Sequence, residues 1–115
     1  MIELILFEWL KKQLAPTKVY MEEPKDGGKT FVLIEKTGGA ESVGVSTATI
    51  AIQSYETSKL KAAKLNEEVK IAVNKIAEGM GDVIKAELNS DYNFTDTDTG
   101  RYRYQAVYDI TYYKN

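Results

Sequence analysis

The segment from Asp91 to Tyr113 constrains the fold of this chain most. From residue 102 onward the even positions are apolar or aromatic: Tyr102, Tyr104, Ala106, Tyr108, Ile110 and Tyr112. The odd positions are mainly polar, and alternation with period two over twelve residues predicts one long strand. Such a strand needs paired neighbours on both sides or a partner chain, because an unpaired edge invites association with other chains. We therefore expect a sheet around residues 102–113, with the even-numbered face forming the floor of the core.

The rest of the chain shows the periodicity of two helices and four further strands. The helices are predicted at 2–14 and 58–78, and the strands at 17–22, 31–36, 43–55 and 82–89. Gly38-Gly39 is expected to break one strand before a hairpin through 37–42. A turn is predicted at 23–29, where Gly27 and Gly28 are free to adopt positive φ.

The order helix, strand, strand, strand, helix, strand, strand indicates an α+β protein. We expect a mainly antiparallel sheet of about five strands with two helices packed on one face. No repeat or linker divides the sequence, so a single domain spanning residues 1–115 is predicted.

Composition excludes several classes of function. The chain has no cysteine and no histidine, so it lacks thiolate metal ligands and the base of a Ser-His-Asp triad. A formal net charge of -2 disfavours a general nucleic-acid binder. The N-terminal run MIELILFEWLKK is too acidic for a secretory signal and too short and charged to span a bilayer. A soluble cytoplasmic domain with no membrane partner and no cofactor is expected.

Two short motifs superficially suggest ligand sites. Asp96-x-Asp98-x-Gly100 fails as a calcium loop, because threonines would occupy the ligand positions once Gly100 is aligned with the invariant glycine. A solvated hairpin loop with Asx-type turns is the better interpretation. Gly39 and Gly44 have phosphate-loop spacing, but Val45-Ser46 stands where that loop needs Lys followed by Ser or Thr. No metal or cofactor site is predicted.

Each helix carries more apolar surface than a simple core stripe. In the first helix the apolar surface is unusually wide, which indicates either burial between the sheet and the other helix or docking on a neighbouring subunit. In the second helix Leu60 and Ile71 lie opposite the core stripe, on one line with Lys64 and Glu67. Single exposed apolar residues are ordinary, whereas two on one line also fit a partner surface.

The sequence Arg101-Tyr102-Arg103-Tyr104 has two interpretations. Alternating tyrosines beside arginines resemble the stacking platforms that bind single-stranded nucleic acid, which would make residues 101–108 a small nucleic-acid-binding module. The alternative is that the tyrosines cover the sheet beneath the helices. The acidic stretch that precedes them would repel phosphates, so the second interpretation is favoured. A small enzyme with a carboxylate or tyrosine site is a third class, but no carboxylate pair is placed by the pattern.

Three stretches, taken in order, resemble the small tail-terminator or tail-completion proteins of long-tailed bacteriophages. They are Val19-Tyr20 with Glu23-Pro24, then the strand end Ile34-Glu35-Lys36-Thr37-Gly38-Gly39, then Tyr92-Asn93-Phe94 with Asp96 and Gly100-Arg101-Tyr102-Arg103-Tyr104-Gln105. The match lies in the order and spacing of these motifs across most of the chain. Lys18 departs from the pattern, where proline or an apolar residue is expected.

The resemblance implies a structural role and no catalysis. Such proteins form a ring, commonly a hexamer, that stops polymerisation of the tail tube and joins it to the head. The implied partners are other copies of this chain, the tail-tube protein and the head-tail connector proteins, without sequence-specific nucleic acid. The implied location is the virion tail, reached from the host cytoplasm during assembly.

A closed ring needs a heterologous interface, and two candidate surfaces follow from the pattern. We predict that one side of the ring interface consists of Leu60, Lys64, Glu67 and Ile71. A second contact region is predicted in the loop before the final strand, at Tyr92, Phe94, Asp96, Asp98 and Arg101.

Overall fold

The alternating segment forms strand β5 (Tyr102–Tyr113), which lies inside the sheet and not at its edge. The structure is a computed structural model that describes residues 1–26 and 28–114. β5 pairs antiparallel with β3 (Val45–Glu56) on one side and with β4 (Val83–Asn93) on the other. The long strand predicted at residues 102–113 is therefore confirmed, with the same first and last residues.

Two further strands, β1 (Val19–Tyr20) and β2 (Phe31–Ser42), complete a five-stranded sheet in the order β1-β2-β3-β5-β4 among the described residues. β2 pairs antiparallel with β3 along its whole length. β1 is shorter than the predicted strand at 17–22 and runs parallel to β2, where it pairs with Val32 and Leu33. The sheet is thus mixed, although most of its pairings are antiparallel as predicted.

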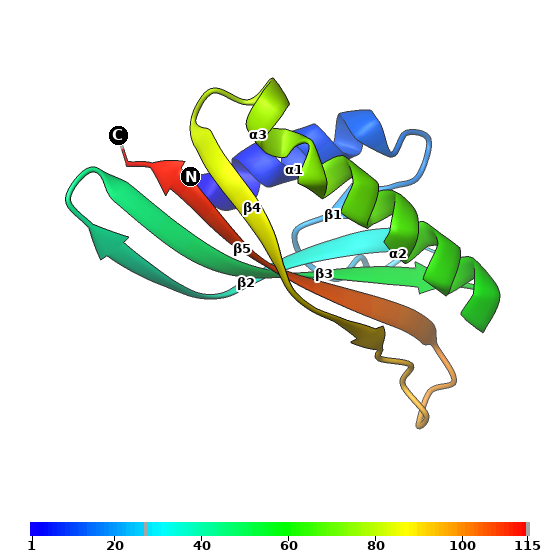
Figure 1. The fold of residues 1–115 in the computed structure, drawn as a ribbon. Coiled ribbons are helices and arrows are strands. Elements are labelled where there is room, and N and C mark those ends of the chain that lie inside the picture. The colour runs from blue at the N-terminus through cyan, green and yellow to red at the C-terminus, as the bar shows by residue number, and fades with distance from the viewer. Residues whose placement is uncertain (27, 115) are drawn as a thin grey trace.

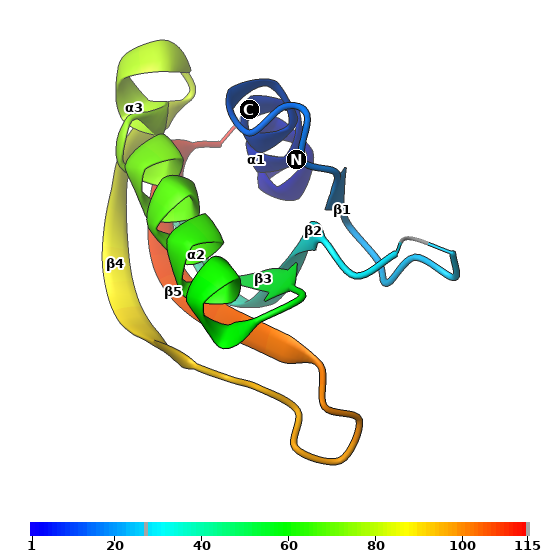
Figure 2. The same ribbon diagram turned by 90° about the vertical axis from the view of Figure 1, so that its right-hand side faces the viewer.

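The helices cover one face of this sheet (Figure 2). They are α1 (Ile2–Gln13), α2 (Lys59–Asn74) and the single turn α3 (Ile76–Gly79). The helix predicted at 58–78 is interrupted at Lys75, which ends α2 and begins α3. Ser58 caps α2, because its hydroxyl accepts a hydrogen bond from the Lys61 amide at 3.2 Å.

The core lies between the helices and the even-numbered face of β5. Ala106, Tyr108 and Ile110 have no exposed surface. Leu6 and Leu10 from α1, and Val69 and Val73 from α2, pack into the same core. The prediction that this face of β5 forms the core floor is confirmed for its central residues, whereas Tyr102 at its start is 40% exposed.

Trp9 connects the helices to one another. Its indole Nε1 donates a hydrogen bond to the Ala72 carbonyl at 2.8 Å, which ties α1 to the end of α2. The outer edge of the same ring lies against Gly79 in α3, where an added Cβ would come closer than 3.0 Å to Cη2 and Cζ3. Gly79 is therefore needed for packing.

The predicted break at Gly38-Gly39 is wrong. β2 continues through both glycines to Ser42 and absorbs an irregularity in register between Lys36 and Gly38, so pairing with β3 resumes. The hairpin turn lies later, at Val43-Gly44, and Gly44 adopts a φ of +73°. Gly28 has positive φ as predicted, at +74°, whereas Gly27 lies outside the described residues.

The β2–β3 hairpin projects beyond the helices at the end of the molecule opposite the β4–β5 loop (Figure 1). We call its outer part, residues 35–47, the arm. Every residue from Glu35 to Gly44 is exposed, and Val43 at the tip is fully so. β4 also differs from its prediction at 82–89, because it continues to Asn93 and so shortens the acidic loop.

Candidate assembly surfaces

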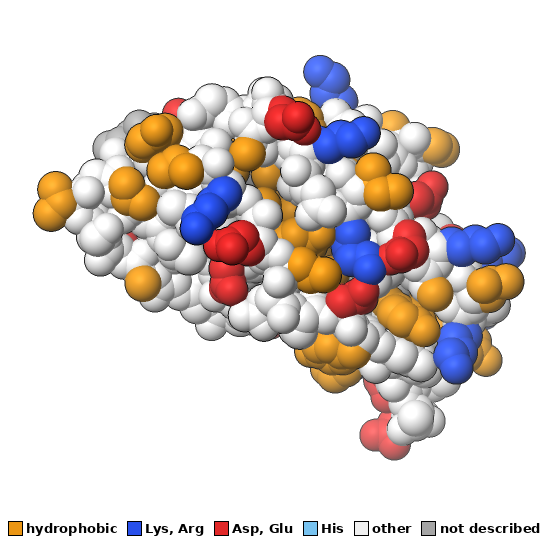
Figure 3. Space-filling view, in the orientation of Figure 1, with side chains coloured by type: hydrophobic (Ala, Val, Ile, Leu, Met, Phe, Trp, Pro, Cys, Tyr) orange, Lys and Arg blue, Asp and Glu red, His pale blue; other side chains and the backbone are white. Residues whose placement is uncertain are grey.

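The predicted contact residues of α2 form a row on the outside of the molecule. Leu60 and Ile71 are 65% and 58% exposed, and Lys64 and Glu67 between them are exposed as well. We call these four residues the outer row. The opposite side of the same helix is buried in the core, as predicted. In the space-filling view, basic, acidic and hydrophobic side chains are interspersed on the face that carries α2 (Figure 3).

Ion pairs anchor α2 to the edge strand β4. The Lys70 ammonium pairs with Asp91 of β4 and with Glu67 of the outer row. The hydrogen bond to Asp91, and to a smaller extent that to Glu67, raises the pKa of Lys70 above its usual value. Asn66, which is 2% exposed, donates to the other Asp91 oxygen at 2.6 Å. These bonds hold α2 to β4 at Asn66 and Lys70, between the two apolar residues of the outer row.

The second predicted contact region, the β4–β5 loop, is a tight hairpin. Its strands close through backbone hydrogen bonds from Phe94 to Arg103 at 2.9 Å and from Asp96 to Arg101 at 3.0 Å. The Asp96 carboxylate accepts a bond from the Asp98 amide at 3.0 Å, which confirms the predicted Asx-type turn. Hydrogen bonds from Thr99 and then from Asp98 lower the pKa of Asp96.

A cluster of arginines and aromatic rings lies at the base of this loop, on the sheet face opposite the helices. We call Phe31, Tyr55, Phe94, Arg101 and Arg103 the Arg–aromatic cluster. The Phe31 and Tyr55 rings stack with centroids 4.5 Å apart. The Arg101 guanidinium lies 4.6 Å above the Tyr55 ring, and that of Arg103 lies 4.2 Å from the Phe94 ring. Both distances suit cation–π attraction.

A chain of hydrogen bonds extends from this cluster across the sheet. Arg103 donates to the Tyr55 hydroxyl at 2.8 Å, and that hydroxyl donates to Gln53 at 2.9 Å. Gln53 donates to Gln105 at 2.8 Å, and Gln105 in turn donates to the hydroxyl of Tyr92. Three of the strands are thereby connected, so the loop and its aromatic residues are held in one geometry.

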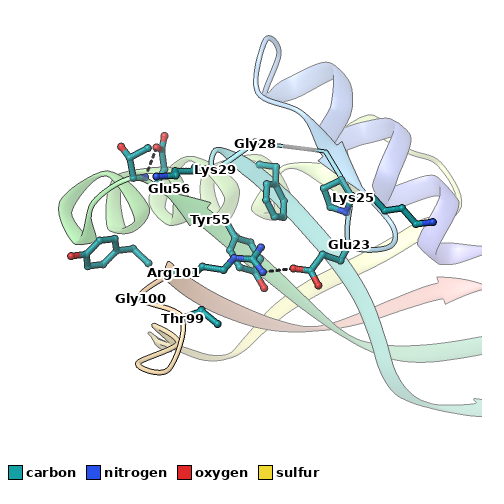
Figure 4. Close-up of a pocket in the computed structure, with 13 residues that line it drawn as sticks. Glu23, Lys25, Gly28, Lys29, Tyr55, Glu56, Thr99, Gly100 and Arg101 are labelled. Carbon is teal, nitrogen blue, oxygen red and sulfur yellow. Dashed lines mark hydrogen bonds and ion pairs between the residues drawn. The ribbon is translucent and has the colours of Figure 1, made fainter.

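Arg101 also joins two loops that are distant in the sequence. Its guanidinium pairs with Glu23, which lies in the connection between β1 and β2 (Figure 4). A cleft of about 620 Å³ lies between these loops, with Phe31, Tyr55, Lys25 and Lys29 among its lining residues. Both acids of the cleft are engaged, because Glu23 holds Arg101 and Glu56 accepts from Thr30 at 2.9 Å. The described lining residues thus offer no free carboxylate pair for acid–base catalysis.

The strand separates the tyrosines and arginines that suggested a nucleic-acid platform. Tyr104 lies opposite Ser54 on the helix-covered face, whereas Arg103 lies opposite Tyr55 on the other face. The predicted row of tyrosines and arginines therefore does not lie on one face of the strand. Arg101 and Arg103 lie instead beside the rings of Tyr55 and Phe94, on the face away from the helices.

Sequence reasoning placed Arg101 and Phe94 in a contact loop but did not find the cluster that holds them. Phe31 and Tyr55 lie at opposite ends of two strands, and they become neighbours through the register that pairs the two residues directly. The alternation of the strand at 43–55 could have indicated this cluster. Its even-numbered residues face the core, so the odd-numbered Tyr55 lies on the opposite face of the sheet.

Within residues 1–26 and 28–114, no group of three or more potential ligand residues is arranged to hold a metal ion. The helices of the same residues include none long and apolar enough to cross a membrane. No protein-family model matches this chain, and no curated protein matches it either.

Proposed function

We propose that this protein is the subunit of a ring that terminates the tail tube of a long-tailed bacteriophage and connects it to the head. The phage role rests on the ordered motifs that resemble tail-terminator proteins. The proposed partners are other copies of the chain, commonly six, together with the tail-tube protein and the head-tail connector proteins. The ring would assemble in the host cytoplasm and remain in the virion tail, with no catalytic activity of its own.

The outer row is the observation that carries the assembly role. Full burial of a Leu or Ile side chain contributes about 1.5–3 kcal/mol. Because Leu60 and Ile71 retain 65% and 58% of their exposure, covering them would contribute roughly 1–2 kcal/mol each. Lys64 and Glu67 supply charges of both signs beside them, as is usual at the rim of an interface.

The β4–β5 loop is the second contact region in this proposal. Tyr92 and Phe94 are about 40% exposed and pack edge to face, with ring centroids 5.7 Å apart. Aromatic residues held rigidly before binding lose little conformational entropy when a partner covers them. Arg103 provides that rigidity, because it donates to the Phe94 carbonyl in the loop and to the Tyr55 hydroxyl in β3. Asp96, Asp98 and Arg101 supply charge in the same loop.

The test is a double substitution in the outer row, Leu60→Asp with Ile71→Asp. We expect the wild-type protein to form closed rings, seen by light scattering across concentration and by electron microscopy. The double variant should weaken each contact by roughly 30- to 1,000-fold, the equivalent of about 2–4 kcal/mol, and so dissociate the ring. Its far-UV circular dichroism should stay close to that of the wild type, because both side chains are exposed in the monomer.

A control variant, Lys12→Gln with Lys61→Gln, changes the net charge by the same amount at exposed positions outside the row. It should retain the ring. An oligomer that persists unchanged after Leu60→Asp and Ile71→Asp would contradict the assignment of the outer row.

A further inference from the structure

Both edges of the sheet carry backbone that no strand of the described residues covers. At one edge, β1 pairs with β2 at Val32 and Leu33, which leaves the outer edge of the arm from Glu35 to Ser42 open. At the other edge lies β4, the last strand in the sheet order. Open edges expose unpaired N–H and C=O groups that can pair with another strand.

The two edges are complementary in direction. β2 and β4 run in opposite directions, because β2 is antiparallel to β3, β3 to β5, and β5 to β4. When two copies in the same orientation are placed side by side, β4 of one therefore meets β2 of the next as an antiparallel pair. The helices of both copies then remain on the same side of the continuous sheet.

The faces and side chains fit in one register. Two irregularities in β4 leave Lys85–Leu88 as a regular run of four residues. Setting Gly39 opposite Leu88 puts Ser42 opposite Lys85, and every pair in between then has both members on the same face of the sheet. A shift of this register by one residue would put the two members of every pair on opposite faces of the sheet.

This register also covers the apolar residues that the single chain leaves exposed at its edges. Leu88 is 46% exposed and would lie beside Gly39, where it would pack against the aliphatic part of the Lys36 side chain that lies over this glycine. Ile84 is 37% exposed and would approach Val43, the fully exposed residue at the tip of the arm. The charges within the two paired segments have partners in their own chain, Lys85 with Glu87 at 3.1 Å and Glu41 with Lys114 at 3.2 Å. Contact would therefore bring no unpaired like charges together.

We propose that copies of this protein join edge to edge, with residues 39–42 of the arm pairing antiparallel with residues 85–88 of β4 in the next copy. The contact is heterologous, since each copy offers one edge of each kind, and its repetition gives a ring if the rotation closes. Pairing of β4 with β4, or of arm with arm, would instead stop at a two-fold dimer. This inference rests on the proposed ring and adds an edge-to-edge contact to those proposed for the outer row and the β4–β5 loop.

The absence of cysteine from the sequence makes the test direct. Ala40 and Glu87 are exposed and lie opposite each other in the proposed register, on the face away from the helices. A variant with both Ala40→Cys and Glu87→Cys is treated with a short bis-maleimide cross-linker and separated on a denaturing gel. We expect a ladder of covalent multimers. An equimolar mixture of the two single variants should give covalent dimers and nothing larger, and each single variant alone should stay monomeric.

Other cross-linking patterns would overturn the inference. Dimers formed by either single variant alone would indicate a two-fold contact, and a double variant that stays monomeric would exclude the edge contact. A matched control, Ala40→Cys with Lys64→Cys, places the second thiol on the outer row and should give no ladder. A ladder there, with none from the Ala40 and Glu87 pair, would show that the arm docks on α2 instead.

Electron microscopy of the uncross-linked protein separates this inference from the proposed function. Closed rings without the expected ladder would retain the ring and refute the edge contact. A ladder from a protein that forms only open chains would retain the edge contact and refute the ring.

Discussion

Replacing Gly79 with alanine tests the packing that joins the three helices. In an ordinary helix this change stabilises a protein by about 0.5–1 kcal/mol, because alanine loses less backbone entropy on folding. Here the new Cβ would lie closer than 3.0 Å to two atoms of the Trp9 ring. Overpacking of this kind costs about 1–3 kcal/mol. If the ring moves away, the hydrogen bond from Nε1 to the Ala72 carbonyl is lost as well, at about 0.5–1.5 kcal/mol.

The net expectation for Gly79→Ala is a destabilisation of about 1–3 kcal/mol, which corresponds to a fall of roughly 4–12 °C in melting temperature for a domain of this size. Urea unfolding followed by far-UV circular dichroism is the suitable assay. Trp9 is the sole tryptophan, so its fluorescence would report the perturbed site directly and would be lost in the companion variant.

That companion is Trp9→Phe, whose shorter ring does not reach as far toward Gly79. In its background Gly79→Ala should cost much less or become favourable, giving a coupling of about 1–3 kcal/mol in the double-mutant cycle. Gly81→Ala is the matched control, because an added Cβ there meets nothing within 4 Å. Equal effects of Gly79→Ala in both backgrounds, or a stabilised single variant, would refute the packing argument.

Two further predictions concern the core and the arm. Burial raises the pKa of Tyr108 to about 12, so ionisation of this hydroxyl favours the unfolded chain and the stability of the protein should fall as the pH rises from about 10 toward 12. Tyr108→Phe should remove part of this fall, which urea unfolding across that pH range would measure. An unchanged pH dependence in the variant would contradict the prediction. At the arm, Gly44→Ala should cost about 1–2 kcal/mol because of its positive φ, whereas Gly38→Ala, with open space and ordinary φ, should change stability by less than about 0.5 kcal/mol. Equal thermal stabilities of these two variants would argue against the observed position of the turn.

The sequence predicted the fold best where one periodicity acts over many residues. Every even position of residues 102–113 is apolar or aromatic, and the strand occupies that range because neighbours on both sides satisfy its backbone. The exposure of Leu60 and Ile71 followed in the same way from the helical period of α2. Both predictions needed only the local pattern and the rule that one face is buried.

The predictions from sequence differ from the structure where residues distant in the chain determine the local conformation. Gly38-Gly39 has the composition of a turn, yet β3 supplies a partner strand that extends β2 past it. β4 continues through Asp91, against its low strand propensity, because Lys70 and Asn66 of α2 hold that carboxylate. The Arg–aromatic cluster depends on the register of β2, β3 and β5 together, which no single segment encodes.

The central position of β5 has a consequence for the order in which the protein is made. Translation delivers β1 to β4 first, yet β4 has no partner strand in the sheet until β5 is inserted between β3 and β4. Val45 pairs with Tyr113 across more than half of the sequence, and contacts of such long range slow folding. Until that insertion, the nascent chain exposes strand edges that the finished subunit covers. We therefore expect chaperone binding to be concentrated on chains in which the other four strands have left the ribosome and β5 has not.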